Sequence, residues 1–133
     1  MPILLVKVSA PRSATLTRQI ADLLLDLTQH ILGKSPALTS IAIDHVDPQD
    51  WYVGGRSLSD QGLNSVYFDI KVTDETNTKE QKAAYIAEAF AGLAKLLGPL
   101  HPESYIFVHD VRAAAYGYGG LTQEHRYQHP QQG

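Results

Sequence analysis

Apolar residues recur along this chain in two rhythms, one typical of strands and one typical of helices. Residues 3–8 form an apolar-rich run that predicts a strand, and residues 40–46 predict a second one. Between them, apolar residues recur at helical spacing over residues 16–31, and Gly33 is a helix stop signal. The segment 51–55, which ends in Gly-Gly, completes this first part of the chain.

The second half of the chain repeats the order of the first. Residues 66–72 alternate as a strand, residues 83–97 carry a helical stripe, and residues 105–111 predict a further strand. The predicted stripe consists of Ala83, Ile86, Phe90, Leu93 and Leu97. Matched positions in the two halves are Lys7 with Lys71, Leu32 with Leu97, Ile41 with Ile106, Val46 with Val111, and Gly54-Gly55 with Gly119-Gly120. Secondary structure and turn residues repeat together, which indicates an internal duplication.

Two tandem β-α-β units predict an α+β fold, an α/β two-layer sandwich. The units, about residues 2–62 and 65–127, form one domain with a four-stranded sheet and two helices on one of its faces. Ile3 and Leu5 then lie on the other face of the sheet, where apolar side chains favour a partner subunit. Residues 128–133 are predicted to be a polar tail.

Composition excludes several classes of function. The chain has 133 residues, a formal net charge of −3 and no run of Lys or Arg, which argues against binding to nucleic acid or to a membrane surface. It has no cysteine, no secretory signal pattern and no segment with the roughly 20 apolar residues of a membrane span. We therefore expect a cytoplasmic protein.

Pro2 is the candidate catalytic residue. It directly follows Met1, and removal of Met1 would convert it into a secondary amine on a rigid strand. Burial and nearby cations both lower the pKa of an amine, which lets it act as a general base at neutral pH. The second half begins at Val66, inside the chain, so each chain has at most one such site.

Four features of the first half resemble the tautomerase superfamily, typified by 4-oxalocrotonate tautomerase, in its fused form of two β-α-β units. They are Pro2, Arg12, the Leu38-Thr39-Ser40-Ile41 entry into the second strand, and Trp51-Tyr52-Val53-Gly54-Gly55. The resemblance implies a tautomerase/MIF-like fold, a homotrimer, and a keto–enol tautomerase that uses Pro2 on an enol or 2-keto acid without a cofactor.

The resemblance also implies roles for other residues. Arg12 stands at the position of a carboxylate-binding arginine, and Asn77 is its match in the second half. Trp51 stands where the family has an aromatic wall beside the proline, and Tyr116 is its counterpart. We therefore expect these residues to bind substrate.

A second family arginine, on the strand after the helix, has no counterpart in this chain. Its position is Ala42 in the first half and Phe107 in the second, which we also expect to contact substrate. Neither side chain can bind a carboxylate, so a less charged and more apolar substrate than a diacid is predicted. Arg112, Arg126 or a lysine is a candidate to replace the missing cation.

Other functions stay open at this point. One alternative is a decarboxylase or hydratase of a small unsaturated or 3-oxo acid, and another is a non-catalytic trimeric binding or assembly protein. Asp44-His45 and His109-Asp110 occupy matched strand ends, but adjacent strand residues point to opposite faces. We therefore predict no metal site.

Overall fold

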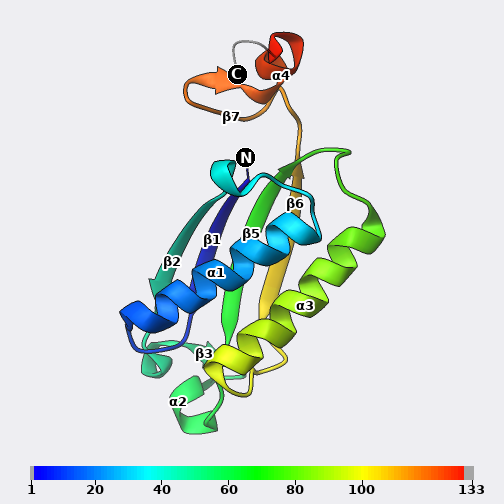
Figure 1. Ribbon diagram of the computed structural model, residues 1–133. Coiled ribbons are helices and arrows are strands. Elements are labelled where there is room, and N and C mark those ends of the chain that lie inside the picture. Colours follow the sequence, from blue (N-terminus) through cyan, green and yellow to red (C-terminus); the bar gives the residue numbers. More distant parts are fainter. Residues whose placement is uncertain (1, 131–133) are drawn as a thin grey trace.

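The computed structural model describes residues 2–130, and its centre is a mixed four-stranded sheet (Figure 1). The strand order is β2-β1-β5-β6, with bounds β1 Ile3–Val8, β2 Ser40–His45, β5 Val66–Thr73 and β6 Tyr105–Val111. Within each unit the two strands are parallel, and the units meet through the antiparallel pair of β1 and β5. The predicted α+β fold with tandem β-α-β units is confirmed.

Two long helices, α1 (Ala14–His30) and α3 (Lys79–Leu97), cover one face of this sheet (Figure 1). The Ser13 side chain caps α1 by accepting a hydrogen bond from the Leu16 N–H. A capping box begins α3, because the side chains of Thr78 and Gln81 each accept a hydrogen bond from the other residue's backbone N–H group. Both helices therefore begin where their polar residues match the free N–H groups of a first turn.

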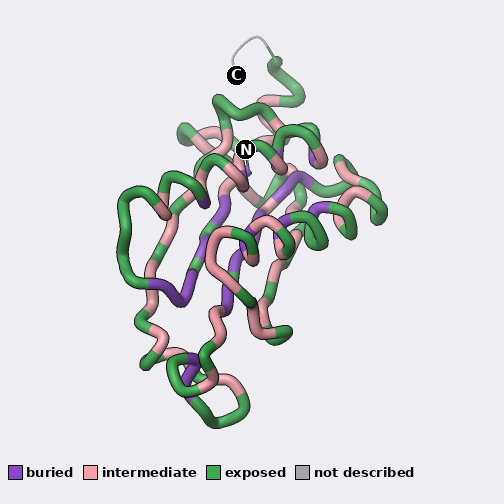
Figure 2. Tube along the Cα trace, turned by 60° about the horizontal axis from the view of Figure 1, so that its bottom comes forward, coloured by how far each residue is buried: buried purple, intermediate pink, exposed green. Residues whose placement is uncertain are grey.

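The core lies between the helices and the inward faces of the strands, as the buried stretches along the tube show (Figure 2). Its strand residues are Leu4, Val6, Val8, Val66, Phe68, Ile70 and Val72. From α3 it takes Tyr85, Ala89 and Leu93, whereas Ile86 of the predicted stripe is 37% exposed. The buried face of α3 is therefore rotated from the predicted one, because Tyr85 hydrogen-bonds Thr28 of α1 and its ring packs edge-on against Phe68.

Each unit ends in a small hairpin and a short helix. After β2 and the 3₁₀ turn η2 (Pro48–Asp50) come β3 (Tyr52–Val53), β4 (Arg56–Ser57) and α2 (Leu58–Gln61). After β6 come β7 (Gly117–Tyr118), β8 (Leu121–Thr122) and α4 (Gln123–Gln128). The two hairpins lie at opposite ends of the sheet. The hairpin with β7 lies close in space to the N-terminus (Figure 1).

The short helices were not predicted, since four and six residues are too few for a periodic pattern. Gln128, the first residue of the predicted polar tail, ends α4, while residues 131–133 of that tail lie outside the described residues. A further 3₁₀ turn, η1 (Pro36–Leu38), leads into β2.

The sheet face away from the helices carries exposed apolar and aromatic side chains. These are Leu5, Tyr67, Tyr105 and Phe107 among the large ones. Within residues 2–130, no helix has the length and apolar character needed to cross a bilayer.

The buried phenol of Tyr85 predicts a loss of stability at high pH. Burial raises its pKa from 10.0 to about 12, while its hydrogen bond to Thr28 opposes the shift. Only the unfolded state ionises between these two values, so the free energy of unfolding falls as pH rises across that window, by about 2–3 kcal/mol for this group.

Tyr85→Phe should remove this pH dependence. Near neutral pH we expect the substitution to cost about 1 kcal/mol, because the Thr28 hydroxyl loses its partner. The cost should shrink or change sign at about pH 11.5, which urea unfolding at the two pH values would measure. Tyr52→Phe, at an exposed tyrosine, is the control. An equal cost of Tyr85→Phe at both pH values would contradict this account.

Candidate functional site

Pro2 is buried at the edge of a pocket of about 530 Å³. Four segments line this Pro2 pocket: the start of β1, the segment Ala37 to Ser40 before β2, Lys71 of β5, and the hairpin residues Tyr116 to Tyr118. Its walls are mainly apolar or aromatic. A free amine at Pro2 would lie against apolar surface and beside one ammonium group. Met1 lies outside the described residues.

Tyr116 reaches Pro2 because of the strand directions. β6 runs parallel to β5 and β5 runs antiparallel to β1, so the chain that leaves β6 arrives where β1 begins. The Tyr116 hydroxyl is hydrogen-bonded to Thr73 Oγ1, and burial raises the pKa of this phenol above its usual value. A phenol is protonated at neutral pH even without this shift, so the hydroxyl is able to donate a hydrogen bond.

Lys71 is the one cation that lines the Pro2 pocket within residues 2–130. It pairs with Ile3 in the β1–β5 ladder. Its Nζ lies 2.8 Å from Asp69 Oδ1, and the Asp69 residue is only 8% exposed. The ion pair holds the ammonium group on the open face of the sheet, at the pocket wall. The sequence alone does not single out Lys71 among the candidate cations, because no local pattern tells which strands pair.

Arg12 and Trp51 lie at the other end of the sheet from Pro2. Arg12 is exposed and lines a recess with His45 and Asp47, beyond the carboxyl end of β1. The strand alone separates the two ends by about 20 Å. Trp51 lines a second recess, together with Tyr67 at the start of β5. Neither residue lines the Pro2 pocket of its own chain, and their substrate-binding roles stay predictions.

Asn77 has two partners within the fold. Its Nδ2 donates to the Leu32 carbonyl oxygen at 2.8 Å and to Gln81 Oε1 at 3.1 Å. These bonds tie the loop before α3 to the segment that follows α1. Its predicted contact with substrate is not tested by this arrangement.

Phe107 lies on the open face of the sheet, where its ring stacks between those of Tyr105 and His109. It does not line the Pro2 pocket. Arg126 lies closer to that pocket, because its guanidinium sits 4.0 Å over the ring of Tyr118 and donates to the Tyr118 carbonyl oxygen. Its contribution to the pocket is to hold this wall residue in position.

Among residues 2–130, no group of three or more His, Asp or Glu side chains gathers in a way that could hold a metal ion. The Pro2 pocket offers an amine position, one ammonium group, one phenol and apolar walls. Such a set suits proton transfer on a small anion.

Comparison with known proteins identifies the fold. No family model matches the sequence, and no curated protein matches it. Among solved structures, Pt0534 inactivated by 2-oxo-3-pentynoate is 18% identical, covering 92% of this chain and 97% of that one with a TM-score of 0.79.

Two further structures extend the likeness. The Q0 fused 4-OT wild-type symmetric trimer is 18% identical over 92% of this chain and 96% of that one, with a TM-score of 0.76. A macrophage migration inhibitory factor-like protein from Entamoeba histolytica is 17% identical over 91% and 97%, with a TM-score of 0.74. The chain thus has the tautomerase/MIF-like fold in its fused, two-unit form.

Proposed function

We propose that this protein is a keto–enol tautomerase, an isomerase that acts on an enol or 2-keto acid through the amine of Pro2. The observation that carries the proposal is the shared pocket of Pro2, Lys71 and Tyr116. Apolar walls and a neighbouring ammonium both disfavour the charged form of an amine, so Pro2 would be a free base. The proposal requires that the mature chain begin at Pro2.

The reaction needs only proton movement. The Pro2 nitrogen takes the proton of the enol hydroxyl and returns a proton to the neighbouring alkene carbon. The oxygen lone pair forms the new C=O bond, and the C=C electron pair forms the new C–H bond, so no co-reactant is consumed. The Tyr116 hydroxyl, held beside Thr73, would donate a hydrogen bond to the oxygen on which charge develops.

Lys71 would bind the substrate carboxylate. Its ammonium group shares the open face of the sheet with Asp69, which holds it in place at 2.8 Å. A single ammonium supports one carboxylate, while Leu38 and Tyr118 provide apolar and aromatic wall for the rest of the molecule. We therefore expect a 2-keto or enol monoacid with an apolar body to be preferred over a diacid.

The amine can be tested without knowledge of the physiological substrate. Pt0534 was inactivated by 2-oxo-3-pentynoate, a conjugated alkynone to which an amine adds without loss of any atom. The N–C bond forms at the alkyne carbon remote from the ketone, and the adjacent carbon takes up a proton. We expect the N-terminal peptide of this protein to gain the whole mass of the reagent, as measured by mass spectrometry.

The same mass spectrum shows whether the mature protein retains Met1. Turnover of phenylenolpyruvate should fall about 100-fold in Pro2→Ala, which loses the secondary amine. Retained Met1 in the mature protein, or equal turnover by the two proteins, would contradict Pro2 catalysis.

Lys71→Gln should lower kcat/KM for phenylenolpyruvate about 10- to 100-fold, because a charge-assisted hydrogen bond to the carboxylate is lost. Lys7→Gln is the matched control, since Lys7 occupies the repeated position but does not line the Pro2 pocket. Steady-state rates with 2-hydroxymuconate give the second comparison. A rate for this diacid far above that for the monoacid would contradict the assignment of a single binding cation.

The proposal includes a homotrimer. Its support is the apolar open face of the sheet, on which Leu5 is 49% exposed, together with the symmetric trimer of the Q0 fused 4-OT. A contiguous exposed apolar surface on a sheet favours burial against another subunit.

Leu5→Glu should therefore dissociate the trimer, because it would bury a carboxylate without a partner. Sedimentation equilibrium should give three times the chain mass for the unaltered protein and a smaller mass for the variant. Ile86→Glu, on the outer side of α3, is the control and should stay trimeric. A monomer before any substitution would contradict the proposed assembly.

A further inference from the structure

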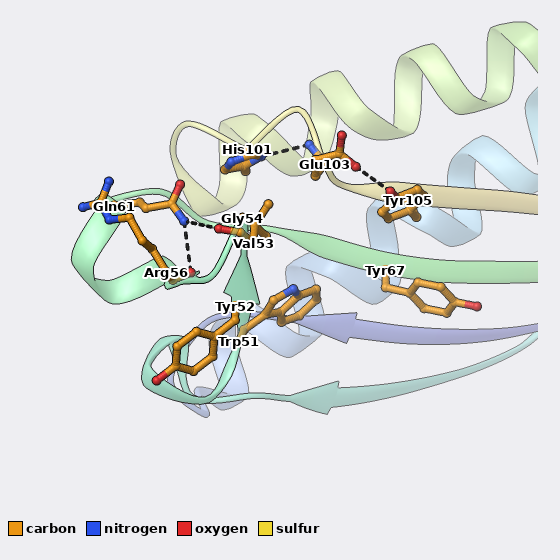
Figure 3. A pocket seen from close by; sticks show the side chains of 10 residues that line it. All are labelled: Trp51, Tyr52, Val53, Gly54, Arg56, Gln61, Tyr67, His101, Glu103 and Tyr105. Carbon is orange, nitrogen blue, oxygen red and sulfur yellow. Dashed lines mark hydrogen bonds between the residues drawn. The ribbon is translucent and has the colours of Figure 1, made fainter.

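The duplicated fold builds a second recess at the opposite end of the sheet from Pro2. This second pocket, of about 750 Å³, lies between the hairpin that follows β2 and the segment His101 to Tyr105 before β6, with Tyr67 at the start of β5 (Figure 3). Each of these segments is the counterpart of one that lines the Pro2 pocket. The second pocket is therefore a repeat of the first, built with other side chains.

The second pocket has no amine for catalysis. Its strand starts at Val66 inside the chain, and the Val66 N–H donates to Ser104 Oγ. Glu103 takes the place of Leu38, since these residues stand three positions before the matched pair Ile106 and Ile41. An apolar wall residue has thus been exchanged for a carboxylate.

The Glu103 carboxylate is held in a defined position. It accepts a hydrogen bond from the Tyr105 hydroxyl, and this bond together with the negative charge raises the pKa of the phenol. The backbone N–H of Glu103 donates to His101 Nδ1 at 3.0 Å, which places the proton of a neutral His101 ring on Nε2. The first bond holds the carboxylate beside the Tyr105 ring, and the second holds the Glu103 backbone beside His101.

Three aromatic residues from three segments line the second pocket, and the Tyr67 ring also packs against Phe107 with ring centroids 5.8 Å apart. Trp51 comes from the hairpin, and Tyr67 and Tyr105 are partners in the β5–β6 ladder and lie on one face of the sheet. Faces of aromatic rings attract cations, and the indole of tryptophan does so most strongly. Rings combined with a carboxylate are the chemistry that selects an organic ammonium ion.

Arg56 also lines the second pocket, but at its far end. Its Nη2 donates to the Asp60 carbonyl oxygen at 3.3 Å. In Figure 3 its side chain lies beside Gln61, away from Glu103 and Tyr105. Lys7, the repeat of the Lys71 cation, lines the adjoining recess, which also includes Asp50, Trp51 and Tyr67. Lys7 does not line the second pocket itself. The second pocket therefore contains a carboxylate that the Pro2 pocket lacks, and the Arg56 guanidinium lies away from that carboxylate.

We infer that the second pocket is a binding site for a small quaternary or alkylated ammonium ion, separate from the Pro2 pocket and without catalytic function. The rings of Trp51, Tyr67 and Tyr105 would enclose the cationic head, and the Glu103 carboxylate would balance its charge. The inference does not depend on the tautomerase activity.

Trp51 makes this site directly observable, because it is the only tryptophan of the chain. Titration of the full-length protein with benzyltrimethylammonium should give a saturable change in tryptophan fluorescence. Choline should do the same, and its uncharged isostere 3,3-dimethylbutanol should not. An equal response to the alcohol, or tighter binding of benzoate than of the cation, would overturn the inference.

Substitutions locate the site within the fold. Glu103→Gln should weaken binding about tenfold, whereas Glu88→Gln, at an exposed glutamate on α3, should leave it unchanged. Pro2→Ala should also leave it unchanged, which separates this site from the proposed catalytic one. Arg56→Gln should leave affinity equal or raise it, because a positive charge is removed. A loss of binding in Arg56→Gln, or none in Glu103→Gln, would overturn the inference.

Calorimetric titration provides a second measurement, which is independent of any change that a substitution makes to the fluorescence itself. Tyr105→Phe keeps the ring and removes the hydroxyl that orients Glu103, so it should weaken binding less than Tyr105→Leu does. Equal affinities for the two variants would show that the ring does not contact the ligand and would contradict the proposed arrangement.

Discussion

The antiparallel pairing of β1 with β5 is the interaction on which the rest of this structure depends. In its register Leu4 faces Ile70, Val6 faces Phe68, and all four side chains are at most 1% exposed. Complete burial of such a side chain contributes about 1.5–3 kcal/mol. A slip of β1 by one residue would turn Leu4 and Val6 to the open face and bring Ile3 and Leu5 inward, so the pairing admits one register.

This pairing also creates the Pro2 pocket. Because β1 and β5 are antiparallel, the hairpin of the second unit lies at the start of the first strand. Pro2 and Leu38 come from the first unit, whereas Lys71 and Tyr116 come from the second. A single β-α-β unit would lack both Lys71 and Tyr116. The duplication is thus a condition for the complete pocket within one chain.

The two ends of the sheet illustrate how a repeated fold separates two kinds of chemistry. A chain has one N-terminus, so only one of two equivalent recesses can present an amine. The other recess presents no N-terminal amine. It carries Glu103 where the first has Leu38, and Trp51 where the first has Tyr116. The same backbone arrangement thereby places an ammonium group in the wall of one pocket, and a carboxylate with a more distant guanidinium in the wall of the other.

The amino-acid sequence by itself determined the four strands of the main sheet, the two long helices, the capping box at Thr78 and the duplication, because these follow from local spacing and local hydrogen bonding. It also singled out Pro2 and Tyr116 as candidate residues. The tertiary structure alone decided that Tyr85 and not Ile86 faces the core, since that depends on a hydrogen bond to another helix. It likewise decided that Lys71 lines the Pro2 pocket, while Arg12 and Trp51 do not line this pocket of their own chain. The burial of two apolar strands against each other decides which strand ends meet, and their paired residues are 58 to 68 positions apart in the chain. No local pattern carries that choice.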